Sequence, residues 1–207
     1  MPDGETVLLF LAAALALNLT PGPDMLYVAA RSGAEGRSAG VVSALGIAVG
    51  CLVHTGALAL GLAGILAAVP AAYDIVRFLG AAYLVWLGVR MLRRPEPLGG
   101  MDEIEPARLG AIFRQGVVTN VLNPKVALFF LAFLPQFVTP ARDAVPQILI
   151  LGLLFNTSGT LVNLGVALLA SRATIWLRRG RGAAYLQRIT GAVFIGLGLR
   201  LALGGRR

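Results

Sequence analysis

Two long stretches without charged side chains constrain the fold of this chain more than any other feature. Residues 38–73 and 144–171 contain no Asp, Glu, Lys or Arg. A helix crosses the hydrocarbon core of a bilayer in roughly 20 apolar residues, so each stretch is long enough to span a membrane. Over the whole chain only 14% of residues are charged and 57% are hydrophobic, whereas an average soluble domain has about 25% charged residues. The sequence therefore predicts an all-α integral membrane protein.

Six apolar runs are long enough to be transmembrane helices if arginines at the ends of the shorter runs reach the membrane surface. They cover residues 6–30, 40–69, 73–92, 112–138, 145–170 and 185–204. The first run has the length of a signal peptide, but Asp3 and Glu5 precede it, where a signal peptide carries positive charge. We therefore expect a retained first helix and one transmembrane domain over residues 1–207.

The one long polar stretch, from Arg93 to Arg114, predicts a flexible linker. It divides the chain into a first half, residues 1–92, a linker, residues 93–111, and a second half, residues 112–207. The loops between runs one and two, three and four, and five and six carry twelve arginines, and the opposite side carries five. The positive-inside rule then places those loops and the linker in the cytoplasm and both termini outside. If the chain crossed the membrane five times instead of six, one terminus would lie on the cytoplasmic side.

Three short motifs recur in the same order in the two halves, which suggests duplication of a three-helix unit. The pairs are Asn18–Asp24 with Asn120–Lys125, Leu45-Gly46 with Leu151-Gly152, and Leu87–Arg90 with Leu197–Arg200. Because three is an odd number, the second copy would cross the membrane in the opposite direction. Inverted repeats with broken helices are typical of secondary transporters.

Proline-containing motifs interrupt the first and fourth runs, and we expect helices 1 and 4 to be broken there. A proline inside a helix removes a hydrogen bond and clashes with the preceding turn. Backbone groups released in hydrocarbon must be satisfied by protein or by a water-filled cavity. The two breaks therefore form the candidate substrate site, whose residues are Asn18, Thr20, Pro21, Gly22, Pro23, Asp24, Asn120, Asn123, Pro124 and Lys125.

Asp24 and Lys125 are the charges that lie deep inside apolar runs, each directly after the last proline of its motif. We expect them to face one another, either as a structural ion pair or as the two poles of a site for a zwitterion. His54 is the only histidine of the chain. It is interpreted as a hydrogen-bonded packing residue or, together with Asp24, as a candidate for coupling transport to protons.

Two further patterns leave alternatives open. A polar patch in the fifth run would join helices or line a cavity, and it comprises Asn156, Thr157, Ser158, Thr160 and Asn163. Gly46 and Gly50 form a GxxxG pattern, which indicates close helix packing either inside the fold or in a homodimer.

Other function classes have little support in the sequence. The net charge is +8, but the arginines lie between the apolar runs, as in cytoplasmic loops, so nucleic-acid binding is not expected. The single cysteine, Cys51, excludes an internal disulfide and a cysteine-based zinc cluster. There is no motif of a hydrolase or a phosphate-binding loop. We expect no enzyme activity, no cofactor and no metal.

Motifs spread along nearly the whole chain resemble the LysE/RhtB family of amino-acid exporters. They are Thr20–Asp24, Gly80–Gly88, Asn120–Lys125 and Phe133–Phe137. The resemblance implies proton-driven efflux of amino acids or their derivatives across the bacterial cytoplasmic membrane. It is greatest to the branch that exports threonine, homoserine and homoserine lactone. The alternatives are a metal or cation exporter of the wider superfamily, which would need more Cys, His or acidic ligands, and a membrane scaffold without transport activity.

Overall fold

The computed structural model describes residues 4–68, 105–139, 143–169 and 181–203, together with 78, 81–82, 85–86, 88–90 and 92–93. All regular structure in these residues is helical. The longer helices are α1 (Gly4–Leu19), α2 (Pro23–Glu35), α3 (Arg37–Ala68), α5 (Leu109–Val121), α7 (Ala144–Leu168) and α9 (Arg181–Leu203). After α5 come α6 (Pro124–Leu128), the π-helical turn η1 (Phe129–Phe133) and the 3₁₀ turn η2 (Leu134–Phe137).

The first and fourth apolar runs are broken, as the sequence predicts. The chain bends by 49° between α1 and α2, and by 45° between α5 and the segment from Pro124 to Phe137. Pro23 and Pro124 are the first residues of α2 and α6. A proline fits there because the first backbone N–H groups of a helix have no partner within the helix. Each break therefore restarts a helix in a new direction.

Four of the six predicted spans are supported by the length and composition of the described helices. The structure has two unbroken candidate spans, one from Arg37 to Gly61 and the other α7, and each bent pair adds one more. The third predicted run, 73–92, lies mostly outside the described residues. The sixth forms α9, which carries arginines at positions 188 and 200 and is not among the four. The chain is therefore a multi-pass membrane protein.

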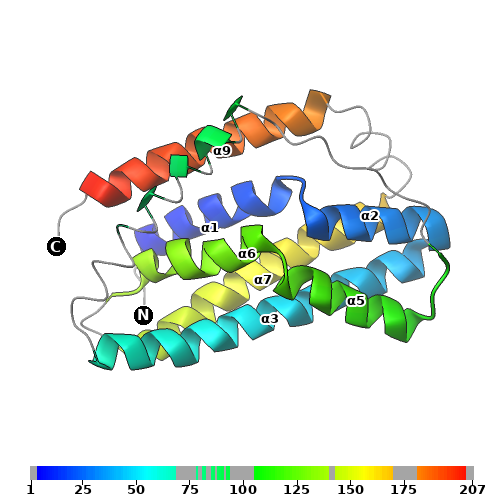
Figure 1. Ribbon diagram of the computed structural model, residues 1–207, viewed down its shortest axis with the longest axis horizontal. Helices are drawn as coiled ribbons and strands as arrows, with labels where there is room; N and C mark the ends of the chain where they lie inside the picture. The colour runs from blue at the N-terminus through cyan, green and yellow to red at the C-terminus, as the bar shows by residue number, and fades with distance from the viewer. Residues whose placement is uncertain are drawn as a thin grey trace.

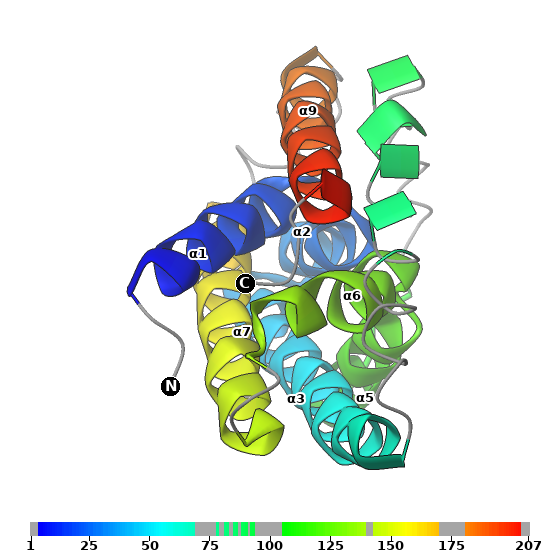
Figure 2. The same ribbon diagram turned by 90° about the vertical axis from the view of Figure 1, so that its left-hand side faces the viewer.

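The long helices pack side by side, with α3 in contact with α2, α5 and α7 (Figures 1 and 2). Helix α1 contacts α7 and α9. The start of α1 and the end of α9 lie at the same end of the bundle, while α2 ends and α5 begins at the opposite end (Figure 1). We call this opposite end the linker end, because residues 105–108 lie there.

The GxxxG pattern of α3 packs inside the fold. A Cβ atom added to Gly46 would collide with the backbone carbonyl of Phe113, and one added to Gly50 would lie 2.8 Å from the Cβ of Asn120. Both contacts are with α5. The close approach of these two helices therefore needs glycines on α3 and brings Asn120, at the second break, against α3.

Aromatic rings fix the second break against α1 and α7. Phe129 of η1 stacks on Phe155 of α7, with ring centroids 4.5 Å apart, and lies 5.9 Å from Phe10 of α1. All three are buried. The segment after α6 is thus held between α1 and α7, near the middle of both helices.

Candidate functional site

At the first break, the end of α1 is satisfied by a side chain from the other half of the chain. The Lys125 ammonium donates hydrogen bonds to the carbonyl of Thr20 at 2.8 Å and to that of Leu17 at 3.2 Å. A positive charge at the C-terminus of a helix is favourable because the last carbonyls point toward it. Gly22 leaves space for this contact, since a Cβ there would lie 3.0 Å from the Lys125 Nζ.

At the second break, Asn120 and Asn123 have different partners. The side-chain oxygen of Asn123 caps α6 by accepting from the backbone N–H of Lys125 at 3.0 Å. The side-chain amide of Asn120 donates to Asp24 Oδ2 at 2.8 Å, across the two halves. Each of the two deep charges, Asp24 and Lys125, is therefore bound by groups at the other break.

Asp24 and Lys125 do not form an ion pair in this arrangement. Among the described residues the ion pair within 4.0 Å joins Arg31 to Glu35. Asp24 and Lys125 instead line the same small cavity. Of the two forms of the sequence-based hypothesis, the direct ion pair is not formed in this structure, and the site for a zwitterion stays a prediction.

Three buried polar atoms at the breaks have no hydrogen-bond partner within the described part of the chain: Asp24 Oδ1, Asn120 Oδ1 and Asn123 Nδ2. The Asn123 amide lies near the Asp24 carboxylate but lacks the geometry of a hydrogen bond. A buried polar atom without a partner costs about 1–3 kcal/mol. Such atoms call for a ligand, water or ion as the missing partner.

The cavity lies between the two breaks and α7. It encloses about 30 Å³ of space open to the centres of water molecules, which is room for about two waters. Of the predicted site residues, Asn18, Asp24, Asn120 and Lys125 line it. The lining does not include Thr20, Pro21, Gly22, Pro23, Asn123 or Pro124, which form the backbone of the breaks.

The polar patch of α7 divides into residues that join helices and residues that line the cavity. Asn18 donates to Ser158 Oγ at 2.9 Å and to the Phe155 carbonyl at 3.3 Å, which ties α1 to α7. Asn156, Thr160 and Asn163 line the cavity, whereas Thr157 is exposed on the outer surface of the helix.

Several lining residues were missed by the sequence analysis. Met25, Ile47, Cys51, Val126 and Phe155 form an apolar part of the lining. No signal in the sequence distinguishes them from the many other apolar residues of the helices. The three polar residues of α7 did carry a signal, because their spacing of four and three residues puts them on one helix face.

His54 lies beside the site rather than in it. Its Nε2 atom is 3.1 Å from the backbone carbonyl of Asn120, and its ring stacks on Phe130 with centroids 5.6 Å apart. It does not line the cavity. Asn120 nevertheless connects the histidine to Asp24, since its backbone contacts the first and its side chain the second.

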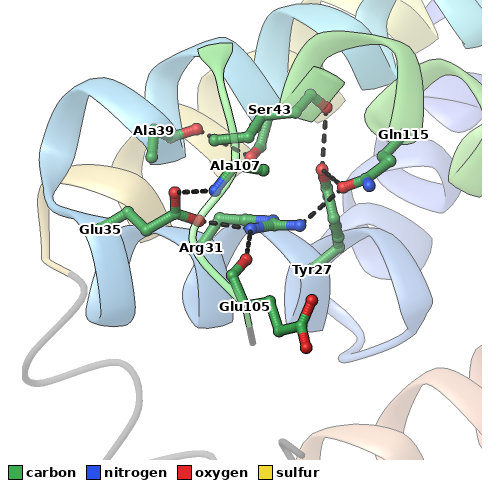
Figure 3. Close-up of polar contacts among 9 residues, drawn as sticks. Tyr27, Arg31, Glu35, Ala39, Ser43, Glu105, Ala107 and Gln115 are labelled. Atoms are coloured by element: carbon green, nitrogen blue, oxygen red, sulfur yellow. Dashed lines mark hydrogen bonds and ion pairs between the residues drawn. The ribbon is translucent and has the colours of Figure 1, made fainter. Parts of the chain in front are cut away.

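A second polar cluster joins the two halves at the linker end (Figure 3). Arg31 follows the first predicted run, which ends at residue 30, but α2 continues to Glu35 and Arg31 is only 6% exposed. Its guanidinium contacts Glu35 and donates to Gln115 Oε1 at 2.7 Å and to the Glu105 carbonyl at 3.0 Å. Glu35 also accepts from the Ala107 N–H at 2.9 Å.

Tyr27 completes this cluster, which we call the Arg31 cluster. Its hydroxyl donates to the Ile112 carbonyl at 2.8 Å, and the guanidinium of Arg31 lies 5.8 Å from the centre of its ring. Residues 105–107 and α5 are thereby attached to α2 through side chains (Figure 3).

The sequence of the chain is similar to those of known membrane transport proteins. Residues 15–205 match the sequence profile of the LysE type translocators, which covers nearly the whole chain. The chain belongs to the LysE type translocator family. No solved structure matches this LysE-type translocator significantly.

Three relatives illustrate the range of similarity of this LysE-type translocator. A homoserine/homoserine lactone efflux protein of Salmonella typhimurium is 28% identical over 93% of this chain and 94% of its own length. A leucine efflux protein of Salmonella choleraesuis is 32% identical over 62% of this chain and 61% of its own. An uncharacterized membrane protein of Pseudomonas aeruginosa is 36% identical over 89% and 88%. The family and these names point to membrane transport rather than to catalysis.

Proposed function

We propose that this translocator exports small amino acids or their derivatives from the cytoplasm by secondary-active, proton-coupled transport. The expected substrates are threonine, homoserine, homoserine lactone and other neutral amino acids. The observation that carries the proposal is the cavity between two broken helices, lined by Asp24 and Lys125 and containing buried polar atoms without partners. Relatives named as efflux proteins for homoserine and leucine support the substrate class.

An inverted repeat of two three-helix units is part of the proposal, and a pair of glycine contacts supports it. A Cβ added to Gly88 would meet the Gly191 carbonyl and Ile195, and one added to Gly198 would meet the Ala81 carbonyl and Val85. The two sets of contacts are related by a single offset, since residues 81, 85 and 88 correspond to residues 191, 195 and 198, each 110 positions later in the chain. Two-fold related units make equivalent contacts of this kind in both directions.

The positions of the ends support six spans in the inverted arrangement. The start of α1 and the end of α9 lie at the same end of the bundle (Figure 1), as an even number of crossings requires. We place the linker end in the cytoplasm and both termini outside, in the bacterial cytoplasmic membrane, because of the arginine distribution. Residues 1–92 and 112–207 are then the two repeats, joined by a cytoplasmic linker.

Within the cavity, we assign the two charges to the two ends of a zwitterion. Asp24 Oδ1 and Asn120 Oδ1 are unpartnered acceptors and suit the three N–H donors of a substrate ammonium. The Lys125 ammonium uses two of its three N–H groups on backbone carbonyls at the end of α1 and can donate the third to a carboxylate or, in homoserine lactone, to the ring carbonyl. The cavity holds about two waters, so binding an amino acid requires the two halves to move apart, as in alternating access.

For proton coupling we assign Asp24 and His54, both of which contact Asn120. A carboxylate and an imidazole are the side chains whose charge responds to a proton gradient. His54→Gln preserves a hydrogen-bonding side chain beside the Asn120 carbonyl but cannot carry the proton. We expect the variant to lose the pH dependence of efflux while it still exchanges substrate. Retention of the wild-type pH dependence in proteoliposomes would remove His54 from the mechanism.

Counterflow in proteoliposomes tests the proposal. Vesicles loaded with unlabelled threonine or homoserine should accumulate the same labelled amino acid from outside, and leucine, lysine and arginine are screened in parallel. Protein-free vesicles and the Arg37→Gln variant, which changes an exposed charge outside the site, are the controls. If no amino acid moves, the proposal of amino-acid transport is wrong. If counterflow occurs but an imposed proton gradient does not change net efflux, only the coupling is wrong.

A further inference from the structure

Three polar residues of α7 form a row along one wall of the cavity. Asn156, Thr160 and Asn163 follow one another at intervals of four and three residues, so they share a helix face. All three line the cavity. Their neighbours Thr157 and Leu161 are exposed on the outer side of α7, where lipid would surround them. We call these three residues the α7 row.

The α7 row has unused hydrogen-bonding capacity. Asn163 is only 7% exposed, and its side chain makes no hydrogen bond with any described residue. The one side-chain hydrogen bond within the row is long, from the Thr160 hydroxyl to Asn156 Oδ1 at 3.4 Å. An amide that lines a cavity and has no protein partner is free to bond a water or a ligand there. The cavity beside it is the place for that partner.

The α7 row is held in a fixed position relative to the first break. Asn18 bonds Ser158 and the Phe155 carbonyl on α7. Gly159 lies so close that an added Cβ would be 3.1 Å from Asn18 Oδ1. Groups that are positioned by such contacts can distinguish ligands better than groups that move freely.

The walls of the cavity differ in chemistry. Asp24 and Lys125 come from α2 and α6, whereas the α7 row is polar but uncharged, and Met25 and Ile47 provide an apolar surface. Charged groups of a substrate are best matched by the two charges. A neutral hydroxyl or carbonyl of its side chain is best matched by the α7 row.

We infer that Asn156, Thr160 and Asn163 determine substrate specificity by hydrogen-bonding the uncharged polar part of the substrate's side chain. The inference rests on the proposed function and narrows its substrate class. Amino acids with a side-chain hydroxyl or carbonyl are exported in preference to aliphatic ones of the same size. Asn163, which has no other partner, makes the main contact.

Threonine and valine provide the test, because they have nearly the same shape and differ by a hydroxyl in place of a methyl group. Wild-type protein in proteoliposomes is given labelled threonine in counterflow, with unlabelled threonine or valine as competitor outside. We expect threonine to compete at least about tenfold better than valine, because a site built to bond a hydroxyl rejects an analogue that lacks it.

Variants then assign the preference to the α7 row. Thr160→Val and Asn163→Leu should each reduce the threonine-to-valine ratio by about tenfold, mainly through weaker threonine transport. Thr157→Val is the matched control, since it makes the same change as Thr160→Val one turn away on the exposed side of α7. It should keep the wild-type ratio.

The possible results separate this inference from the proposed function. Equal competition by threonine and valine in the wild type overturns the inference while amino-acid transport stands. A wild-type ratio that persists in Thr160→Val and Asn163→Leu also overturns it. If Asn163→Leu does not fold, the wild-type ratio and Thr160→Val decide the question. Absence of counterflow for every amino acid means that the proposed function itself is wrong.

Discussion

The two helix breaks and the Arg31 cluster both join the halves of the chain through polar side chains, but they are satisfied to different degrees. In the Arg31 cluster the guanidinium has three partners and both oxygens of Glu35 are bonded, while Arg31 Nε is the one buried side-chain atom of the cluster that lacks a partner among the described residues. At the breaks Asp24, Asn120 and Asn123 each keep a buried atom without a partner. A network in which most groups are bonded stabilises one arrangement, whereas three unpartnered atoms around one cavity leave capacity for a ligand.

The largest effect on transport is expected at the breaks. Asp24→Asn keeps the size of the side chain and an oxygen that can accept from Asn120, but removes the negative charge next to the proposed ammonium position. We expect counterflow to fall by about 10- to 100-fold, since bonds to charged groups contribute about 1.5–3 kcal/mol. The thermal midpoint of the purified protein should change little.

The Arg31 cluster should respond in the opposite way. Arg31→Gln removes a buried guanidinium together with its hydrogen bonds to Glu35, Gln115 and the Glu105 carbonyl. We expect the free energy of unfolding to fall by about 1.5–3 kcal/mol, the contribution of hydrogen bonds to a charged group, seen as a lower thermal midpoint in detergent. Arg37→Gln is the matched control, because Arg37 is exposed. A midpoint that does not change would show that the cluster does not hold the linker end together.

The Asn123→Ala variant should lower the thermal midpoint less than Arg31→Gln does, although Asn123 lies at the second break. Its side chain caps α6, so Asn123→Ala removes one hydrogen bond from the Lys125 N–H. The loss of such a cap costs about 1 kcal/mol. A thermal midpoint between those of wild type and Arg31→Gln would agree with this role. A loss as large as that of Arg31→Gln would mean that Asn123 supports more than the helix start.

The sequence was sufficient to locate the breaks, because proline acts on its own local backbone. Asp24 and Lys125 were also found, since a charge inside an apolar run is conspicuous. Their partners could not be predicted. The bonds from Lys125 to Thr20 and from Asn120 to Asp24 join residues about a hundred positions apart, and local patterns contain no information about such contacts.

Two further features have local signals in the sequence. Arg31 and Glu35 are four residues apart, a spacing that favours an ion pair on a helix and could have extended the first span beyond residue 30. The spacing of Asn156, Thr160 and Asn163 could have separated them from Thr157. The apolar lining of the cavity had no such signal, because Met25 and Ile47 resemble ordinary lipid-facing or core residues.

The charge-swapped double variant, Asp24→Lys with Lys125→Asp, tests the central claim most directly. The claim is that each charge has its own place, Lys125 on the carbonyls of α1 and Asp24 on the amide of Asn120. The swap would set a carboxylate against carbonyls and an ammonium against N–H donors, although the total charge is unchanged. We predict no counterflow of threonine or homoserine by the reconstituted variant, whereas transport at the wild-type rate would contradict the account.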